Sequence, residues 1–496
     1  MNLFLKLKTV FFRNFWLISV LFFILLRVPS LYEPNWYGDE GIYLVLGQAI
    51  RKGLLLYRDI HDNKPPLLYY AAALSQNVFG FRLLLSLLMI PTIYFFYRLI
   101  KQLVQNENIV KLSTFLFLII TSVPTFEGNI ANAEVFMLLP TILGVYLVLK
   151  PRSGFDFLTA GLLLGIALII KIPVFIEIAF LIFWLISSSL DLLPKINFSP
   201  QKFIQSLHYS SLLILGFVTP IIILGVYYYL GGAFPEYLNA SLLQNFSYLS
   251  SWTTGTHSGS ATQGGILIRG ILLLIAWLVL FFLNRYRLIE NKLYFTSLWL
   301  AATLFGSTLS TRPYPHYLIQ ILPPLVILFA FFLTSPIKQK LLPVFFFLFT
   351  LFIFKKYDFY SYPVIKYYQN FYSFIFKQKD QTAYNQSFSP GVNQDLEIAN
   401  YLKDKVSPGD RIFVWGDHPF IYVLTDTLPT GRFTVAYHVV DFNGYFETLD
   451  SLKIYTPSYI LYYPMANRPF PELDDFIRRY YFLDHQFGQI NLYRLR

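Results

Sequence analysis

Cysteine is absent from this 496-residue chain, and charged side chains are scarce at 14% of the residues. Without cysteine there are no disulfide bonds and no thiolate chemistry. Hydrophobic residues make up 55% of the chain and aromatic residues 19%, a composition that excludes an ordinary soluble globular protein. The sequence therefore predicts an α-helical polytopic membrane protein.

Basic residues outnumber acidic ones and give the chain a net charge of +11. In the first two thirds of the chain they occupy short loops between apolar segments, which is typical of membrane topology rather than of nucleic-acid binding. We therefore expect membrane lipids, and no nucleic acid, among the partners.

Apolar segments predict about 11 transmembrane helices, some of them shorter than 20 residues. The first has a basic flank like that of a signal peptide, but no small-residue cleavage site precedes Glu33, so we expect it to remain as a span. We divide the long run 157–190 before Pro173, because proline removes a helix donor and clashes with the preceding turn. The predicted spans lie near 14–31, 82–100, 110–125, 135–149, 157–171, 173–190, 209–230, 266–283, 293–310, 317–334 and 341–356.

A further apolar segment, 66–79, decides the orientation of all later spans. If it stays on the outer surface, the basic loops face the cytoplasm, and the loops around 126–134 and 231–264, which contain no Lys or Arg, face outside. If it crosses, the charge bias runs backwards. We therefore predict a surface helix and a cytoplasmic N-terminus, in a bacterial inner (plasma) membrane. The basic loop residues are Lys6, Lys8, Arg13, Arg98, Lys101, Lys111, Lys150, Arg152, Lys195, Lys202, Arg285, Arg287, Lys292, Lys338 and Lys340.

The composition changes near Tyr357, where aromatic and charged residues begin to mix. Residues 393–410 predict a helix and 411–417 a strand, and helix-like and strand-like segments alternate after them. We predict a transmembrane domain over 1–356, with a first outer loop at 32–81, and a small extracytoplasmic α/β domain over 357–496.

The first outer loop contains a dense group of charged residues next to the membrane. Asp39 and Glu40 begin a helical pattern that ends at Gly53, and its apolar positions share one face. The pattern predicts an amphipathic helix on the membrane surface. Alternatively, Asp39 only caps the helix and Glu40 only complements its dipole.

On the predicted topology, the outer face collects both carboxylates and cations. This combination suits the attack of a hydroxyl group on a sugar carbon whose leaving group is a lipid-linked phosphate. A carboxylate accepts the acceptor's proton as general base, and cations stabilise the phosphate as negative charge builds on it. The carboxylates are Asp39, Glu40, Asp59, Asp62, Glu127 and Glu134, and the cations are Lys64, Arg82, Lys171, Arg312 and His316.

The first outer loop contains Tyr37-Gly38-Asp39-Glu40, Gly53-x-x-x-Tyr57, Lys64-Pro65-Pro66, Phe79-Gly80 and Arg82. This order resembles the GT-C membrane glycosyltransferases, in particular the protein O-mannosyltransferase and aminoarabinose transferase (glycosyltransferase family 39-like) branches. The resemblance covers roughly residues 14–190, and RPYPHYLIQILPP is similar to a late-span motif of bacterial members. It implies an inverting enzyme that takes a sugar from a polyprenyl or dolichyl phosphate on the outer side.

The resemblance also implies roles for individual residues. Asp39 becomes the catalytic candidate with Glu40 as its neighbour, and Lys64 becomes a contact of the donor phosphate. Glu134 corresponds to a second acidic residue at the start of the fourth span. This chain has Asn63 where the aminoarabinose branch usually has Glu, so no metal or acceptor role is carried over to that position.

The remaining outer residues are candidates by their charge. No cofactor is implied with certainty, although a divalent metal is compatible with the acidic group. Further donor phosphate-binding candidates are Arg82, Lys171, Arg312 and His316, and the acceptor or metal candidates are Glu134, Glu127, Asp59 and Asp62.

Each candidate also has a purely structural interpretation. Cations next to a surface helix anchor it in the lipid headgroups, and loop acids cap or solvate the loop. In that interpretation Lys64 and Arg82 are anchors, Asp59 and Asp62 belong to the loop, Arg312 and His316 are ordinary loop residues, and His61 is a surface residue rather than a ligand.

Two other classes of function compete with a glycosyltransferase. A transporter or flippase of lipid-linked glycans is expected to have inverted repeats and ionisable groups near the bilayer midplane. Here the ionisable groups concentrate at one surface, with Glu177 as the main exception. An O-antigen ligase or polymerase-type enzyme also uses lipid-linked glycans, but the Asp-Glu pair after the first span argues against it. The acceptor, whether a glycan, lipid or protein group, stays open.

Overall fold

The computed structural model describes residues 10–191, 197–244, 261–310, 312–464 and 467–496, which divide into two compact units. Unit 1 consists of residues 1–28, 85–225 and 245–364, and unit 2 of residues 29–84, 226–244 and 365–496. The chain passes from one unit to the other five times, within α2 (Phe15–Leu31), α5 (Val78–Leu103) and α11 (Pro200–Leu230), after residue 244 and at the start of α18 (Val364–Ile375). The sequence analysis instead divides the chain at residue 357, into a transmembrane domain and an extracytoplasmic domain. That division stays a prediction.

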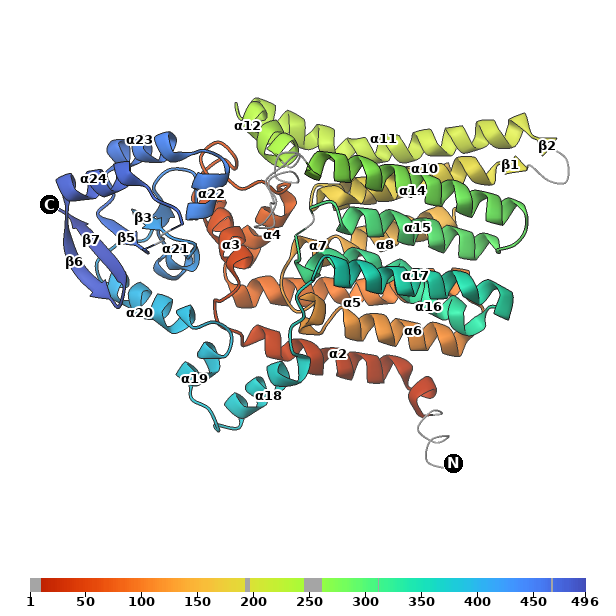
Figure 1. Ribbon diagram of the computed structural model, residues 1–496, viewed down its shortest axis with the longest axis horizontal. Helices are drawn as coiled ribbons and strands as arrows, with labels where there is room; N and C mark the ends of the chain where they lie inside the picture. Colours follow the sequence, from red (N-terminus) through yellow and green to blue (C-terminus); the bar gives the residue numbers. More distant parts are fainter. Residues whose placement is uncertain (1–9, 192–196, 245–260, 311, 465–466) are drawn as a thin grey trace. The chain divides into compact units, whose positions relative to one another are not determined.

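Unit 1 is a bundle of apolar helices (Figure 1). Within it, α15 packs against α10, α14 and α16, and α16 packs against α6 and α17. Its elements are α6 (Glu107–Ile120), η1 (Pro124–Phe126), α7 (Ala133–Phe136), α8 (Leu138–Leu149), α9 (Gly154–Leu168), η2 (Ile172–Val174), α10 (Phe175–Ser188), β1 (Leu190–Asp191), β2 (Asn197–Phe198), α14 (Ala261–Arg285), α15 (Asn291–Ser307), η4 (Pro315–Ile321), α16 (Leu322–Thr334) and α17 (Ile337–Lys356).

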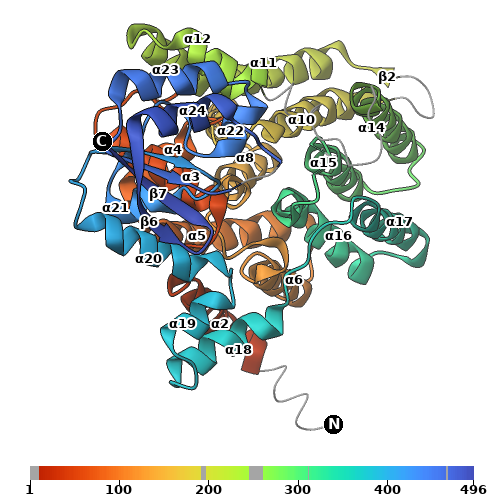
Figure 2. The ribbon, with the colours of Figure 1, turned by 60° about the vertical axis from the view of Figure 1, so that its left-hand side comes forward.

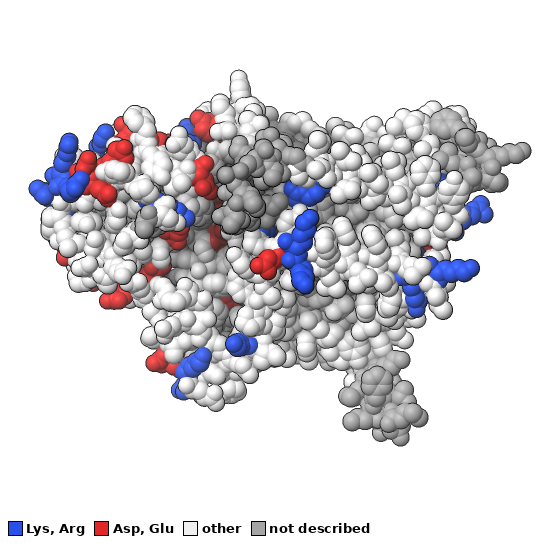
Figure 3. Space-filling view, in the orientation of Figure 1, with Lys and Arg blue, Asp and Glu red and all other residues white. Residues whose placement is uncertain are grey.

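A helix lies at every predicted span, so the predicted fold class of a polytopic α-helical membrane protein is confirmed. Figure 3 shows few charged atoms along the middle of the visible helices of unit 1. The chain is an integral membrane protein, and the number of its spans stays a prediction. In the described part of the chain, the helices long and apolar enough to cross a membrane are 78–103, 200–230, 265–285, 315–334 and 337–356, and shorter apolar helices lie at 15–31, 133–149, 154–168 and 172–188.

The predicted break before Pro173 is also found. α9 ends before it, and Pro173 lies in the first turn of η2, where its missing N–H leaves no helical bond unmade. α9 in turn packs closely on α11, because a Cβ at Gly161 or Gly165 would collide with the backbone carbonyls of Leu213 or Phe217. Small residues at such a crossing are usual between membrane helices.

Unit 2 contains a five-stranded sheet with the strand order β4-β3-β5-β7-β6, surrounded by helices (Figure 2). β3 is parallel to β4 and β5, and β7 is antiparallel to β5 and β6. Its elements are α3 (Gly38–Arg51), α4 (Leu67–Ser75), α12 (Phe234–Leu238), η3 (Asn239–Leu243), α18 (Val364–Ile375), α19 (Gln381–Gln386), α20 (Gly391–Lys403), β3 (Arg411–Trp415), α21 (Phe420–Thr425), β4 (Leu428–Pro429), α22 (Ala436–Asp441), α23 (Tyr445–Tyr455), β5 (Tyr459–Tyr462), α24 (Pro471–Tyr480), β6 (Tyr481–Phe487) and β7 (Ile490–Leu495).

The small C-terminal α/β fold is therefore confirmed, with α20 and β3 where the pattern predicts them. Its hydrophobic core contains residues from both strands and helices. Examples are Trp415 of β3, Leu452 of α23, Ile460 of β5 and Leu473 of α24. Strand β6 was not predicted, because its first residue, Tyr481, continues the helical pattern of α24.

The helix α3 begins at Gly38 and ends at Arg51, and Gly53 follows with a φ of +85°, as the end signal predicts. Every residue from Glu40 to Ala49 is buried within the protein. α4 covers one side of α3 and α21 another, and the Gln48 amide donates to the carbonyl of Thr427 over 2.7 Å.

The segment 66–79 forms α4, a helix of 9 residues. Such a helix is about 13 Å long and falls short of the ~30 Å hydrocarbon core, which agrees with the prediction of a surface helix. Lys6, Lys8 and Lys195 lie outside the described residues. The orientation itself therefore stays a prediction.

Because the chain has no cysteine, one introduced cysteine is a unique label for orientation. Leu243→Cys, at an exposed position in the predicted outer loop, should react with a membrane-impermeant maleimide on intact cells. Lys338→Cys, exposed in a predicted cytoplasmic loop, should react only after permeabilisation. Reversed labelling would overturn the orientation and the outer location of the site.

Candidate functional site

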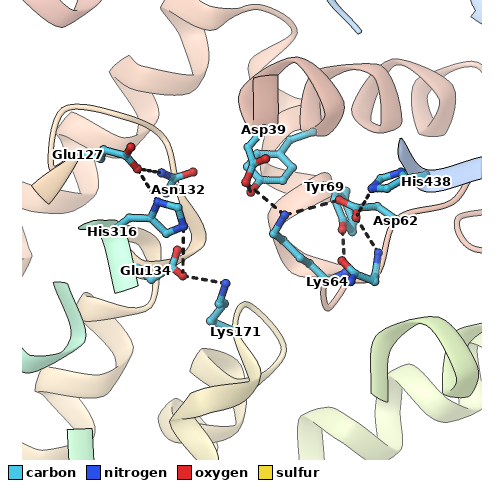
Figure 4. Close-up of polar contacts among 12 residues, drawn as sticks. Asp39, Asp62, Lys64, Tyr69, Glu127, Asn132, Glu134, Lys171, His316 and His438 are labelled. Carbon is cyan, nitrogen blue, oxygen red and sulfur yellow. Dashed lines mark hydrogen bonds and ion pairs between the residues drawn. The ribbon is translucent and has the colours of Figure 1, made fainter. Parts of the chain in front are cut away.

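Asp39 and Lys64 form an ion pair in unit 2 (Figure 4). The Lys64 Nζ lies 3.4 Å from the Asp39 Oδ2, and both side chains are partly exposed, at 20% and 31%. The Tyr43 hydroxyl donates to the same Asp39 oxygen over 2.9 Å. The N-cap residue of α3 is Tyr37. Asp39 lies within the helix, so it is not the capping residue that the alternative interpretation requires.

The backbone of Lys64 is held from two sides. The Tyr57 hydroxyl donates to its carbonyl over 2.7 Å, and its own N–H donates to the Tyr69 hydroxyl over 3.1 Å. Tyr57 adopts a φ of 74°, and this turn of the loop brings the Tyr57 hydroxyl to the carbonyl of Lys64. The rigid Pro65-Pro66 pair follows, so the loop fixes the Lys64 backbone on both sides.

Asp62 lies beside this pair and is buried. Its Oδ1 accepts the N–H of Asn63 over 2.7 Å, and its Oδ2 lies 4.0 Å from the Lys64 Nζ. Burial acts to raise the pKa of Asp62, but the nearby Lys64 and His438 outweigh burial and lower the pKa below its usual value. Asp62 is therefore an ionised carboxylate directed at Lys64.

Glu40 and Arg82 form a second, fully buried ion pair in unit 2. The Arg82 guanidinium donates from Nε and Nη2 to both Glu40 oxygens over 2.8 and 2.6 Å, and its Nη1 donates to the Ser30 carbonyl over 2.8 Å. The same Nη1 lies 2.8 Å from Glu33. Because this guanidinium is engaged on every edge, we interpret Arg82 and Glu40 as structural rather than as a phosphate ligand and a base.

A separate polar chain lies in unit 1, at the starts of three short elements (Figure 4). Glu134, in the first turn of α7, pairs with Lys171, whose Nζ lies 2.7 Å from its Oε1. Lys171 precedes η2, and its ammonium lies 5.0 Å from the centre of the Tyr317 ring. The imidazole of His316, from η4, lies 3.9 Å from the same Glu134 oxygen.

Glu127 completes the chain in unit 1. Its carboxylate contacts the Nδ1 of His316 and accepts the Asn132 amide over 3.2 Å. Glu127 adopts the left-handed conformation, with a φ of 57°, a rare state for a residue with a side chain. The next residue, Gly128, has its carbonyl bound by the guanidinium of the buried Arg27. The structure thus brings together four of the predicted candidates and pairs them mostly with one another. They are Glu127, Glu134, Lys171 and His316.

The other candidates lie apart from these two groups. Asp59 pairs with the exposed Arg58 and accepts the N–H of Leu55 over 2.8 Å, so it stabilises its own loop, as the structural interpretation predicts. Arg312 is buried in unit 1. In the membrane helices, Glu177 accepts hydrogen bonds from Trp299 and Gln320 over 3.0 and 3.1 Å.

The interpretation of His61 as a surface residue is wrong. Its side chain is buried, with ring centroids 5.5 Å from Phe433 and 4.9 Å from Phe442. Burial, with the charges of His438 and Arg432, lowers the pKa of His61 to about 3. The reason is long-range, because the C-terminal α/β fold covers this part of the loop.

Several residues of both groups were missed by sequence reasoning. Tyr43 and Tyr69 look like ordinary aromatic residues of a membrane protein, and Asn132 carries no charge. Glu33 gave a weak signal as the first acid after the first span. His438 gave none, because nothing in its own segment marks it as a partner of the first outer loop.

Within the described residues, no group of three or more His, Asp or Glu side chains is arranged to hold a metal ion. The predicted metal role of the acidic candidates therefore stays a prediction without a preformed set of ligands. The roles of the individual site residues also stay predictions.

The chain has the fold of the GT-C membrane glycosyltransferases, as the resemblance in the first outer loop implies. The particular likeness is to ArnT from Cupriavidus metallidurans, whose crystal structure in the apo state matches with 12% sequence identity and a TM-score of 0.54. The match covers 97% of this chain and 98% of that one.

A second similar structure is the oligosaccharyltransferase of Archaeoglobus fulgidus, tethered to an acceptor peptide containing the NVT sequon. It matches with 11% identity and a TM-score of 0.43, covering 98% of this chain and 75% of that one. By sequence, no family model and no curated protein matches the chain. At these identities the structural likeness concerns the fold alone.

Arg82→Leu should destabilise the protein, because it leaves the buried carboxylates of Glu33 and Glu40 without their cation. Breaking a buried pair in this way costs about 3–5 kcal/mol, which should lower the melting temperature clearly. The matched control is Lys101→Ala on the same helix, whose partner Glu107 is 40% exposed. A stable Arg82→Leu variant that loses donor binding would instead assign Arg82 to the phosphate.

Proposed function

We propose that this protein is a glycosyltransferase that moves a sugar from a polyprenyl-phosphate donor to an acceptor on the outer side of the membrane. The observation that carries the proposal is the Asp39–Lys64 pair, a carboxylate and a cation that are both partly exposed at the start of α3. The GT-C fold of the whole chain supports it. Membrane lipids, a lipid-phosphate donor and a hydroxyl acceptor are the proposed partners.

In this proposal Lys64 binds the donor phosphate. The donor is a phosphodiester with one negative charge, and the departing polyprenyl phosphate carries two. A cation at this position therefore interacts more strongly with the transition state than with the bound donor, which accelerates the reaction.

The donor phosphate also has to displace Asp39 from Lys64. The ion pair is partly exposed, and such pairs contribute about 0–1 kcal/mol. A charge-assisted contact to phosphate contributes about 1.5–3 kcal/mol. The exchange is therefore favourable, and donor binding releases a carboxylate oxygen of Asp39 for the acceptor.

Asp39 then acts as general base. The acceptor hydroxyl transfers its proton to the carboxylate while its oxygen forms a bond to the anomeric carbon of the sugar. The bond between that carbon and the phosphate oxygen breaks, and the phosphate leaves with the electron pair. Attack from the face opposite the phosphate inverts the configuration at this carbon.

We assign the polar chain of unit 1 to substrate recognition rather than to the chemical step. Glu134 and Lys171 form a close pair, and His316 lies between two carboxylates. Such a group offers donors and acceptors of hydrogen bonds to polar substrate groups, without a free base of its own. The transporter alternative loses its main support, because Glu177 is hydrogen-bonded to neighbouring helices.

Lys64→Ala should weaken use of the donor by roughly ten- to a hundred-fold, the effect of losing a charge-assisted contact of about 1.5–3 kcal/mol. The assay is sugar transfer from a panel of polyprenyl-phosphate sugars at varied donor concentration. Lys52→Ala, which removes another partly exposed lysine of the loop, serves as the control. An unchanged donor KM in Lys64→Ala would reassign Lys64 to membrane anchoring.

Asp39→Asn should lower turnover by about 10²–10⁴-fold, the usual contribution of one acid–base group. The substitution keeps the shape of the side chain, so melting temperature and donor binding should stay near wild type. Asp450→Asn, at an exposed position of α23, controls for the loss of one negative charge. Wild-type turnover of Asp39→Asn on a hydroxyl acceptor would sink the general-base assignment.

A further inference from the structure

We propose that His438, from the C-terminal α/β fold, is a positioning residue of the donor site, acting through Asp62 on Lys64. The inference rests on the proposed function, and it makes the α/β fold a working part of the donor site. The first contact is between the His438 Nε2 and the Asp62 Oδ1, which lie 3.6 Å apart (Figure 4). The second is between the Asp62 Oδ2 and the Lys64 Nζ, 4.0 Å apart.

The position of His438 is set by the packing of the first outer loop on the α/β fold. The N–H of His61 donates to the Arg432 carbonyl over 2.8 Å. The His61 ring lies against Phe433 and Phe442, and 6.4 Å from the ring of His438. The residue before Asp62 is thus fixed by residues that flank α22.

The buried side chain of His438 lies next to Asp62. Burial is the main cause that lowers the pKa of His438, and the charge of Asp62 acts in the opposite direction. The Nδ1 atom has no hydrogen-bond partner within the described residues, which leaves Nε2 and its contact with Asp62 as the polar link of this side chain. The charged groups that act on His438 are Asp62, Lys64, Asp441 and Asp39.

The consequence concerns the charge of Asp62. A buried carboxylate attracts the nearest cation strongly, and Lys64 is within reach. The Asn63 N–H and the His438 Nε2 both face the Oδ1 atom of Asp62, whereas the Lys64 Nζ lies 4.0 Å from its Oδ2 atom. In this proposal the contacts on Oδ1 weaken the pull of Asp62 on Lys64, so the ammonium keeps its closer contact of 3.4 Å with Asp39, from which a phosphate displaces it.

Loss of His438 should then draw Lys64 onto Asp62 and weaken phosphate binding. A merely structural role of His438 predicts a different result, because its effect would not depend on Lys64. A double-mutant cycle separates the two cases, since residues that act through one another are not additive.

The experiment measures the binding of undecaprenyl phosphate, without a sugar, to the full-length protein in detergent. We expect His438→Ala to weaken binding about five- to twenty-fold, and His438→Gln, which places an amide N–H beside Asp62, to stay within about threefold of wild type. In the Lys64→Ala background, His438→Ala should change binding by less than about twofold. His485→Ala, exposed on β6 of the same fold, is the matched control and should bind as wild type does.

Equal losses from His438→Ala in the wild-type and Lys64→Ala backgrounds would overturn the inference, as would unchanged binding in His438→Ala. If His438→Ala does not fold, His438→Leu replaces it in the cycle. The cycle does not need sugar transfer. Coupled binding without transfer from any sugar donor would reject the proposed function alone, and transfer with additive binding losses would reject this inference alone.

Discussion

Arg82 lies between two buried carboxylates, and the geometry of the first outer loop depends on this cation. Its guanidinium joins Ser30 at the end of α2 to Glu40 at the start of α3, while Glu33 binds the side chains of Trp36 and Tyr367 over 2.7 and 2.6 Å. Charges without water are stable only when they are fully paired. The pairing therefore fixes where the loop leaves the first span and how α3 is rotated.

The rotation of α3 explains why two neighbouring acids have different surroundings. Successive residues of an α-helix point about 100° apart, so Glu40 bound to Arg82 turns Asp39 toward Tyr43 and Lys64. Asp39 is partly exposed, whereas Glu40 is fully buried. The buried acid holds the helix in place, and the exposed acid pairs with Lys64, the proposed ligand of the donor phosphate.

The sequence predicts those parts of the fold whose causes are local. Apolar periodicity locates the helices, Pro173 locates the break between α9 and α10, and Gly53 marks the end of α3. The site is predicted less well, because its polar contacts join residues far apart in the chain. The charges of Asp39 and Lys64 are visible in the sequence, but the burial of His61 and the partner of Asp62 depend on an α/β fold hundreds of residues away.

Unit 2 combines the first outer loop with the C-terminal fold, although most of the chain separates them. α3 packs against α4 on one side and against α21 of the C-terminal fold on another. The α/β fold therefore supplies the burial that holds Asp62 and His61 out of water. A buried carboxylate needs a cation nearby, and the Lys64 Nζ lies 4.0 Å from Asp62. The order of the proposed donor site thus follows from the packing of a domain that carries none of the proposed catalytic residues.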